Sequence, residues 1–308
     1  MRLIYYSVFF LWYLLSLLPL RVLYVVSDAL FYPLYYIIRY RRRIVRRNLE
    51  TSFPDKSPEE IGRIERGFYH FFVDYVMETL KLFSMPKGQM RRRMTFGGLD
   101  TLQEELRQEG KKTCFVFLGH YCNWEYVASL PGWVPGLHCG QIYHPLYNPA
   151  FDRLFLRLRS QFGGECIPMK ETLRRLLALS REDTTSVIGF IADQAPKWEA
   201  MDHWTTFLHH DTSFFMGLER IARKVDAAVY YLEVKRVRRG YYHAEFQRMT
   251  LHPRETAEGA LTDEYARRLE RQIQEMPDCW LWSHNRWKRT KEEWEQRRKQ
   301  PKEGGNAV

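Results

Sequence analysis

Residues 113–125 read TCFVFLGHYCNWE, and this stretch decides the fold. The run 113–118 is short, almost entirely apolar and uncharged, which is typical of a strand buried on both faces. Similar short runs alternate with helical patterns along the chain: strands are predicted at 113–118, 142–143, 186–192 and 227–234, and helices at 151–162, 172–179 and 212–225. The sequence therefore predicts an α/β fold with a mostly parallel sheet flanked by helices.

The segments on either side of these runs extend the same domain. Ser57 is followed by a proline and two glutamates, which is an N-cap with a capping box, and apolar residues at helical spacing continue to Phe83. Residues 241–246 predict an antiparallel strand and residues 262–276 a helix. Residues 288–308 are polar and highly charged, and we expect them to be loosely ordered.

The first fifty residues predict a membrane anchor. Residues 3–20 carry no charge and are long enough, as a helix, to cross roughly 27 Å of hydrocarbon. Residues 22–38 contain Asp28 and Pro33, so we expect them to form a helix at the membrane surface. Six arginines lie between positions 39 and 47, which favours contact with anionic lipid on the cytoplasmic side.

These segments suggest three parts, with residues 1–50 as membrane anchor and basic segment, 51–287 as the main domain and 288–308 as a charged tail. The chain has 308 residues and a formal net charge of +10, which favours acidic partners: anionic lipid, nucleic acid, a phosphorylated substrate or an acidic carrier protein. Its five cysteines are odd in number and include no Cys-x-x-Cys pair, which argues against a disulfide framework or a structural zinc site.

The best candidate for chemistry is His120 with Glu125. On one continuous helix, positions five apart would point about 140° away from each other, so the two side chains meet only if His120 lies in the loop and Glu125 in the first turn of a helix. Asn123 is a suitable N-cap for that helix. A carboxylate that orients an imidazole makes a general base able to activate a substrate hydroxyl. The alternative is a packed histidine with a solvated glutamate.

Other tempting residues are weaker candidates. Cys122 lies too close in sequence to His120 for a nucleophile and base pair, so a small loop residue is the better interpretation. The run 209–211, His-His-Asp, resembles a metal cluster, but a polar loop before a helix capped by Thr212 or Ser213 explains it more simply. Trp280, Trp282 and Trp287 favour a core or a membrane interface over a stacking platform for nucleic-acid bases.

Several blocks together resemble one known family. These are RNLETSFP at 47–54, GHYCNWE at 119–125, YHPLYNP at 143–149, RSQFGG at 159–164, DQ at 193–194 and PDCWLWSHNRW at 277–287. In order and spacing they resemble the late acyltransferases of lipid A biosynthesis, a branch of the lysophospholipid acyltransferase superfamily. The resemblance covers roughly residues 15–290.

The resemblance implies transfer of a fatty acyl chain from a thioester, of acyl carrier protein or coenzyme A, to a hydroxyl on a hydroxyacyl chain of a phosphorylated lipid A precursor. It implies no cofactor, metal or nucleic acid, and places the enzyme at the bacterial inner membrane with its catalytic domain on the cytoplasmic side. His120 and Glu125 would be catalytic. The residues expected to bind substrate are Asn123, Trp124, His144, Asn148, Arg159, Asp193 and Gln194.

The chain departs from the family pattern at one position. Tyr143-His144-Pro145 stands where the branch commonly has Tyr-Arg-Pro, and a histidine is neither permanently charged nor bidentate. His144 would then contact the acceptor itself, or leave that contact to Arg153, Arg157 or Arg159. Two other functions remain open on sequence alone: acylation of another membrane lipid hydroxyl, and a basic membrane scaffold without catalysis.

Overall fold

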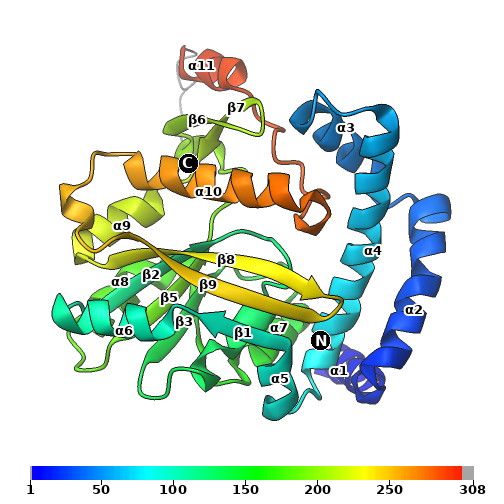
Figure 1. Cartoon of the computed structure of the whole chain (residues 1–308), viewed down its shortest axis with the longest axis horizontal. Coiled ribbons are helices and arrows are strands. Elements are labelled where there is room, and N and C mark those ends of the chain that lie inside the picture. The colour runs from blue at the N-terminus through cyan, green and yellow to red at the C-terminus, as the bar shows by residue number, and fades with distance from the viewer. Residues whose placement is uncertain (1, 300–308) are drawn as a thin grey trace, which may run out of the picture.

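The computed structural model describes residues 2–299 and is built around one seven-stranded sheet (Figure 1). The strand order is β1-β9-β8-β2-β5-β3-β4. The strands are β1 (Met94–Gly97), β2 (Thr113–Leu118), β3 (His138–Tyr143), β4 (Glu165–Pro168), β5 (Ser186–Ile191), β8 (Ala228–Arg238) and β9 (Tyr241–Thr250). Strands β4, β3, β5, β2 and β8 run parallel, whereas β9 is antiparallel to β8 and carries β1 along its other side. The predicted α/β class with a mostly parallel sheet is confirmed.

Helices cover both faces of this sheet, which is why every residue of β2 is buried. Figure 1 shows α10 running across one face and α6 on the other. The α-helices beyond the N-terminal segment are α4 (Pro58–Leu82), α5 (Lys87–Arg93), α6 (Leu99–Gln108), α7 (Pro149–Ser160), α8 (Thr172–Leu179), α9 (Gly217–Val225), α10 (Ala260–Glu275) and α11 (Lys291–Lys299). Short 3-10 turns connect them, the longest being Tyr126–Gly132.

Local sequence signals predicted most of these elements. The helix expected after Ser57 is α4, and its capping box forms in both directions: Ser57 Oγ accepts from the Glu60 amide and Glu60 Oε2 accepts from the Ser57 amide. The antiparallel strand at 241–246 and the helix at 262–276 are confirmed as β9 and α10. The strand expected at 142–143 is longer, because β3 begins at His138.

The helix predicted over 212–225 is wrong in its first part. His210–Phe214 forms strand β7, which pairs antiparallel with β6 (His203–Phe207), and α9 begins only at Gly217. Tertiary contacts decide this segment: the buried guanidinium of Arg286 donates to Thr212 Oγ1 at 2.9 Å and to the Ser213 carbonyl at 2.6 Å. Neither Thr212 nor Ser213 caps a helix. His209 of the His-His-Asp run lies in the turn of this hairpin, and the other two residues of the run begin β7.

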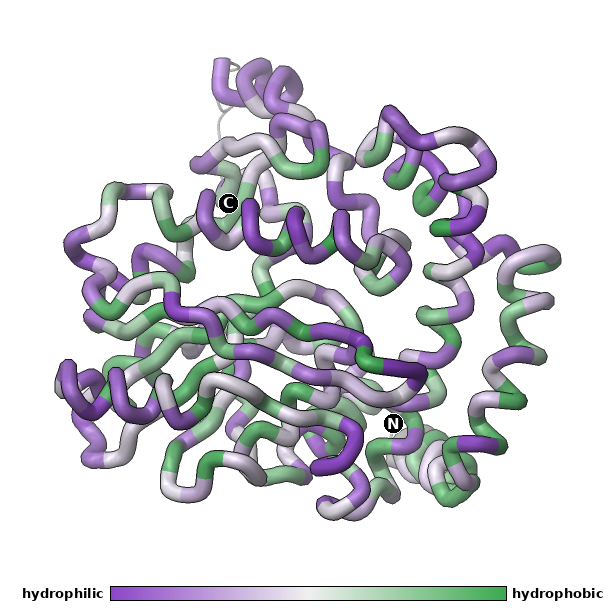
Figure 2. Tube along the Cα trace, viewed as in Figure 1, coloured by the Kyte–Doolittle hydropathy of each residue, from purple (hydrophilic) through white to green (hydrophobic). Residues whose placement is uncertain are grey.

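The helix in the uncharged stretch at 3–20 is shorter than the predicted span, which stays a prediction. Helix α1 (Arg2–Leu17) ends before Pro19, and α2 (Leu20–Tyr32) continues into a π-helical turn, Pro33–Ile38. Among the described residues, Leu20–Ile38 is the one segment long and apolar enough to cross a membrane by length and composition. Its inner side packs on α4, while its other side leaves apolar side chains exposed (Figures 1 and 2).

The basic segment is partly internal to the fold. Arg42 and Arg46, on helix α3 (Arg42–Ser52), both form ion pairs with the buried carboxylate of Glu65 on α4. The expectation that all six arginines face lipid is therefore wrong for these two. The tail also differs from expectation, because residues 291–299 form helix α11; residues 300–308 lie outside the described part of the chain.

We predict that Gly119→Ala destabilises the fold by roughly 1–3 kcal/mol. A Cβ at this position would lie 2.6 Å from Cδ1 of the buried Leu269 and 3.3 Å from Asp193 Oδ2, so both must move. Gly88→Ala is the matched control, because nothing lies within 4 Å of its added Cβ. Urea unfolding of both variants tests the prediction, which fails if they have equal midpoints.

Candidate active site

The candidate site lies where the parallel strands end. His120 follows β2, Asp193 and Gln194 follow β5, and His144 follows β3, so three separate segments reach the same edge of the sheet. Ligands in open α/β sheets bind at this carboxyl edge. The structure thus brings together most of the residues that the sequence singled out.

Asp193 holds His120 by two hydrogen bonds. The His120 backbone N–H donates to Asp193 Oδ2 at 2.8 Å, and the ring Nδ1 lies 2.5 Å from Oδ1. A proton on Nδ1 leaves Nε2 as the acceptor, and that is the tautomer a general base needs. The His120 side chain is 20% exposed, so the ring reaches the surface of the site.

Asp193 itself is buried, and both of its carboxylate oxygens accept hydrogen bonds. Its Oδ2 also accepts a hydrogen bond from the indole N–H of Trp280 at 2.8 Å. Burial alone would raise the pKa of Asp193, but the charge of His120 and the hydrogen bonds from His120 and Trp280 hold that pKa below its usual value. The carboxylate therefore remains ionised and can stabilise a protonated His120.

Glu125 does not contact His120, and this corrects the predicted pairing. Its two oxygens accept from Arg159 Nη2 at 2.6 Å and from Arg159 Nε at 2.8 Å, in a bidentate ion pair that leaves Glu125 only 2% exposed. Helix α7 carries Arg159 to this point, and the turn at 123–126 directs the carboxylate towards it. The charge of Glu125 raises the pKa of Arg159 against the lowering effect of burial.

The residues between His120 and Glu125 are packed rather than free to rearrange. The Trp124 indole meets the His120 ring edge to face at 5.1 Å between centroids, and packs on Tyr75 at 4.2 Å. Asn123 Oδ1 accepts from the Tyr126 amide at 3.2 Å, but the N-cap position of the short 3-10 turn Tyr126–Gly132 is Glu125, so the predicted cap at Asn123 is wrong. Burial raises the pKa of the Cys122 thiol well above its usual value, so Cys122 is not a ready nucleophile.

The remaining predicted residues lie around the opening of the site. Gln194 is exposed, and its Nε2 lies 3.4 Å from His120 Nε2. His144 is exposed in the loop after β3, with Nδ1 at 2.9 Å from the carbonyl of Pro145. Asn148 caps α7 by accepting from the Ala150 amide at 2.9 Å, which is a structural reason for an asparagine there.

Three buried residues next to the site were not among the site residues predicted from the sequence. Trp280 and Arg286 lie in the C-terminal block, and Arg286 is a buried cation whose pKa burial lowers to about 10. Glu78 lies within α4 and has no motif around it. The wider apolar pattern predicted that α4 and the tryptophans pack inside, but nothing in the sequence showed which residues meet at His120. Among the described residues, no group of three or more His, Cys, Asp or Glu side chains could hold a metal ion.

A comparison with family models identifies the chain. The model of the bacterial lipid A biosynthesis acyltransferases matches residues 1–289, which include both N-terminal helices, the whole sheet and the C-terminal tryptophan block. The chain belongs to this family. No curated protein matches the chain at a significant level. The acyltransferase therefore transfers acyl groups in lipid A biosynthesis, with an acyl donor and a lipid acceptor as its substrates.

We predict that Asp193, and not Glu125, sets the tautomer of His120. Asp193→Asn should move the proton to Nε2 and lower kcat by roughly 10³–10⁴-fold. Glu125→Gln, the matched control, should leave the tautomer unchanged because it contacts Arg159. Nitrogen-15 NMR of the imidazole reports the tautomer directly, and a change caused by Glu125→Gln instead would contradict the assignment.

Proposed function

We propose that the acyltransferase transfers a fatty acyl chain from a carrier thioester to the hydroxyl of a hydroxyacyl chain on a lipid A precursor. The observation that supports this proposal most strongly is the state of His120: Nδ1 is held by a buried carboxylate, and Nε2 faces the open side of the site. A base of this kind needs no nucleophile from the protein, because the substrate supplies the alcohol.

The proposed reaction balances with the groups present. His120 Nε2 takes the proton of the acceptor hydroxyl while that oxygen bonds to the thioester carbonyl carbon. The ionised Asp193 stabilises the imidazolium that forms. The carbon–sulfur bond then breaks, and the leaving thiolate takes the proton back from the imidazolium, which restores neutral His120.

In this proposal Gln194 stabilises the intermediate. Its amide nitrogen lies 3.4 Å from His120 Nε2, and its N–H would donate to the carbonyl oxygen as that oxygen becomes negative. The ion pair of Glu125 with Arg159 has a different role in this proposal. It holds the guanidinium of Arg159, which is 22% exposed, on helix α7.

A group of cations on the basic segment and the C-terminal block supports a phosphorylated acceptor. Arg41, Arg47, Lys288 and Arg289 form no ion pair with any carboxylate in the described part of the chain. Arg41 Nη1 donates to the Ser283 carbonyl and Arg47 Nη2 to Asn285 Oδ1, so the basic segment lies against the C-terminal block. Burial, Arg289 and Arg41 lower the pKa of Lys288, as expected for cations that lack a counterion.

His284 connects this group to His120. Its Nε2 accepts from the Ala195 amide at 3.2 Å, directly after Asp193 and Gln194 in the chain. Burial, against the raising effect of the Asp193 charge and with the positive charges of Lys288, Arg286 and His120, lowers the pKa of His284 to about 4. Lys288 thus lies near His284, and in this proposal a phosphate of the acceptor supplies the missing negative charge.

We further propose that the two N-terminal helices attach the enzyme to the cytoplasmic face of the bacterial inner membrane. Figure 2 shows apolar residues recurring along both helices, with hydrophilic ones between them, and many of the apolar side chains are exposed. On the second helix the exposed members are Val22, Val25, Val26, Leu30, Tyr32, Tyr36, Ile37 and Ile38. Arg39, Arg41 and Arg43 follow directly, at the depth where lipid headgroups would lie.

We predict that His120→Ala lowers transfer by about 10²-fold or more while the fold is retained. Mass spectrometry of lipid A from cells with and without the protein should show one added acyl chain that is missing with the variant. His252→Ala is the control, since His252 is exposed and pairs with Glu109 on the surface. Acylation of a different lipid would reassign the acceptor, and normal turnover by purified His120→Ala would refute the mechanism.

A second prediction tests the phosphorylated acceptor. Lys288→Gln should raise the KM for the acceptor roughly 10-fold, about 1.4 kcal/mol, and leave the donor KM unchanged. Arg181→Gln, a cation near the other end of the sheet, should change neither value. An acceptor stripped of its phosphates should be insensitive to the Lys288 substitution, and an equal loss with both acceptors would exclude a phosphate contact.

A further inference from the structure

Helix α4 carries a buried carboxylate that the reaction above does not use. Glu78 lies near the C-terminal end of this helix and is fully buried. Burial raises its pKa to about 7, although hydrogen bonds from Asn123, Tyr242 and Tyr24 each lower it. A buried carboxylate is costly unless its oxygens accept hydrogen bonds, so this position calls for an explanation.

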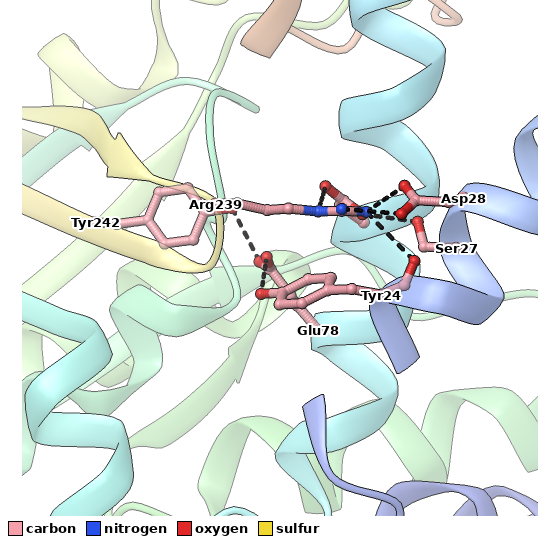
Figure 3. A network of polar contacts seen from close by, with 7 residues as sticks. Tyr24, Ser27, Asp28, Glu78, Arg239 and Tyr242 are labelled. Carbon is pink, nitrogen blue, oxygen red and sulfur yellow. Dashed lines mark hydrogen bonds and ion pairs between the residues drawn. The ribbon is translucent and has the colours of Figure 1, made fainter. Parts of the chain in front are cut away.

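Three donors from three separate segments meet at Glu78. Asn123 Nδ2 donates to Oε2 at 2.7 Å, and Tyr242 Oη on β9 donates to the same oxygen at 2.9 Å. Tyr24 Oη on α2 donates to Oε1 at 2.9 Å. Figure 3 shows both tyrosines converging on the carboxylate from opposite sides.

The contact with Asn123 reaches the reacting group. Asn123 lies between His120 and Glu125, and both ends of its amide are used: Nδ2 donates to Glu78 and Oδ1 accepts from the Tyr126 amide. Trp124, the next residue, touches the His120 ring. A shift of Asn123 would therefore displace the loop that carries His120 and the Glu125–Arg159 pair.

The contact with Tyr24 reaches the apolar N-terminal helix. Besides Tyr24, α2 is held by Ser27, whose Oγ donates to Asp74 Oδ1 at 2.6 Å. Arg239, at the tip of the β8–β9 hairpin, bridges Asp74 and Asp28 with distances of 2.6 and 2.7 Å (Figure 3). Asp74 thus already holds α2 in place. Of the described polar contacts between α2 and α4, the hydrogen bond to Glu78 is the one that leads on to the catalytic loop.

We propose that Glu78 is a positioning residue that holds the 120–125 loop in its reactive geometry and couples it to the seating of α2. This inference rests on the proposed role of His120. Glu78 suits the task because its two oxygens accept hydrogen bonds from donors on three separate segments. Misplacement of a catalytic group by about 1 Å costs on the order of 10² in rate, so a small shift of Asn123 suffices.

Exchanging the carboxylate of Glu78 and the amide of Asn123, singly and together, tests the proposal on the full-length protein. Glu78→Gln keeps the side-chain shape but leaves one acceptor oxygen in place of two, so at least one of the three donors loses its acceptor, and kcat should fall roughly 10- to 100-fold with little change in either KM. Asn123→Asp should also lower kcat, because two carboxylates then meet in a buried site. The double variant restores a donor and acceptor pair, and kcat should recover to within a few-fold of wild type.

A second pair of variants tests the coupling to α2 without altering Glu78. Tyr24→Phe removes the bond from α2 to Glu78 and should lower kcat several-fold. Ser27→Ala removes a bond of the same helix to Asp74 and should leave kcat unchanged at a similar loss of melting temperature. If Glu78→Gln does not fold, the proposal is still tested by comparing Tyr24→Phe with Ser27→Ala and by the double variant of Glu78 and Asn123.

The outcomes separate the two proposals. The positioning role is refuted if folded Glu78→Gln keeps kcat within twofold of wild type, or if the double variant is no better than the product of the single losses. It is also refuted if Tyr24→Phe and Ser27→Ala behave alike. His120→Ala is measured beside them: an active His120→Ala refutes the proposed function itself, whereas an inactive one with active Glu78→Gln refutes only this inference.

Discussion

The buried carboxylate of Asp193 is the constraint on which the site depends. It accepts the backbone and ring N–H groups of His120 and the indole N–H of Trp280, so three distant segments share one charge. Losing one of these donors would leave a buried anion poorly satisfied, which costs more than an ordinary surface contact. The close approach of Gly119 to Leu269 follows from the same requirement, because the chain must pass tightly under α10 to present His120.

The sequence predicted one contact between His120 and Glu125, whereas the structure has two separate ion pairs. His120 with Asp193 lies at the open edge, and Glu125 with Arg159 lies behind Trp124. His120 and Glu125, five residues apart on one loop, thus each contact a different partner. That loop is held from below by Glu78 through Asn123, so its geometry depends on α4 as much as on the sheet.

The N-terminal helices belong to the same packed body as the sheet. Leu20, Leu23 and Phe31 of α2 are part of the core that also contains the strands, and Arg239 ties the hairpin tip to this helix. The segment that we propose to meet the membrane therefore also contacts the frame of the active site. Its acidic residue, Asp28, has a partner in Arg239 and is not an isolated charge on an apolar helix.

The sequence by itself determined the α/β class, strand β2, the capped helix α4 and the presence of His120 at the end of a buried strand. These follow from periodicity, capping and the length of apolar runs, which act between near neighbours. It also brought Asp193 and Gln194 into consideration, because they follow a second buried strand. Only the tertiary structure decided that Asp193 contacts His120, that Glu125 contacts Arg159 and that residues 210–214 form a strand. These choices depend on which strands lie side by side and on partners such as Arg286, 73 or more residues away, whose hydrogen bonds outweigh local preference.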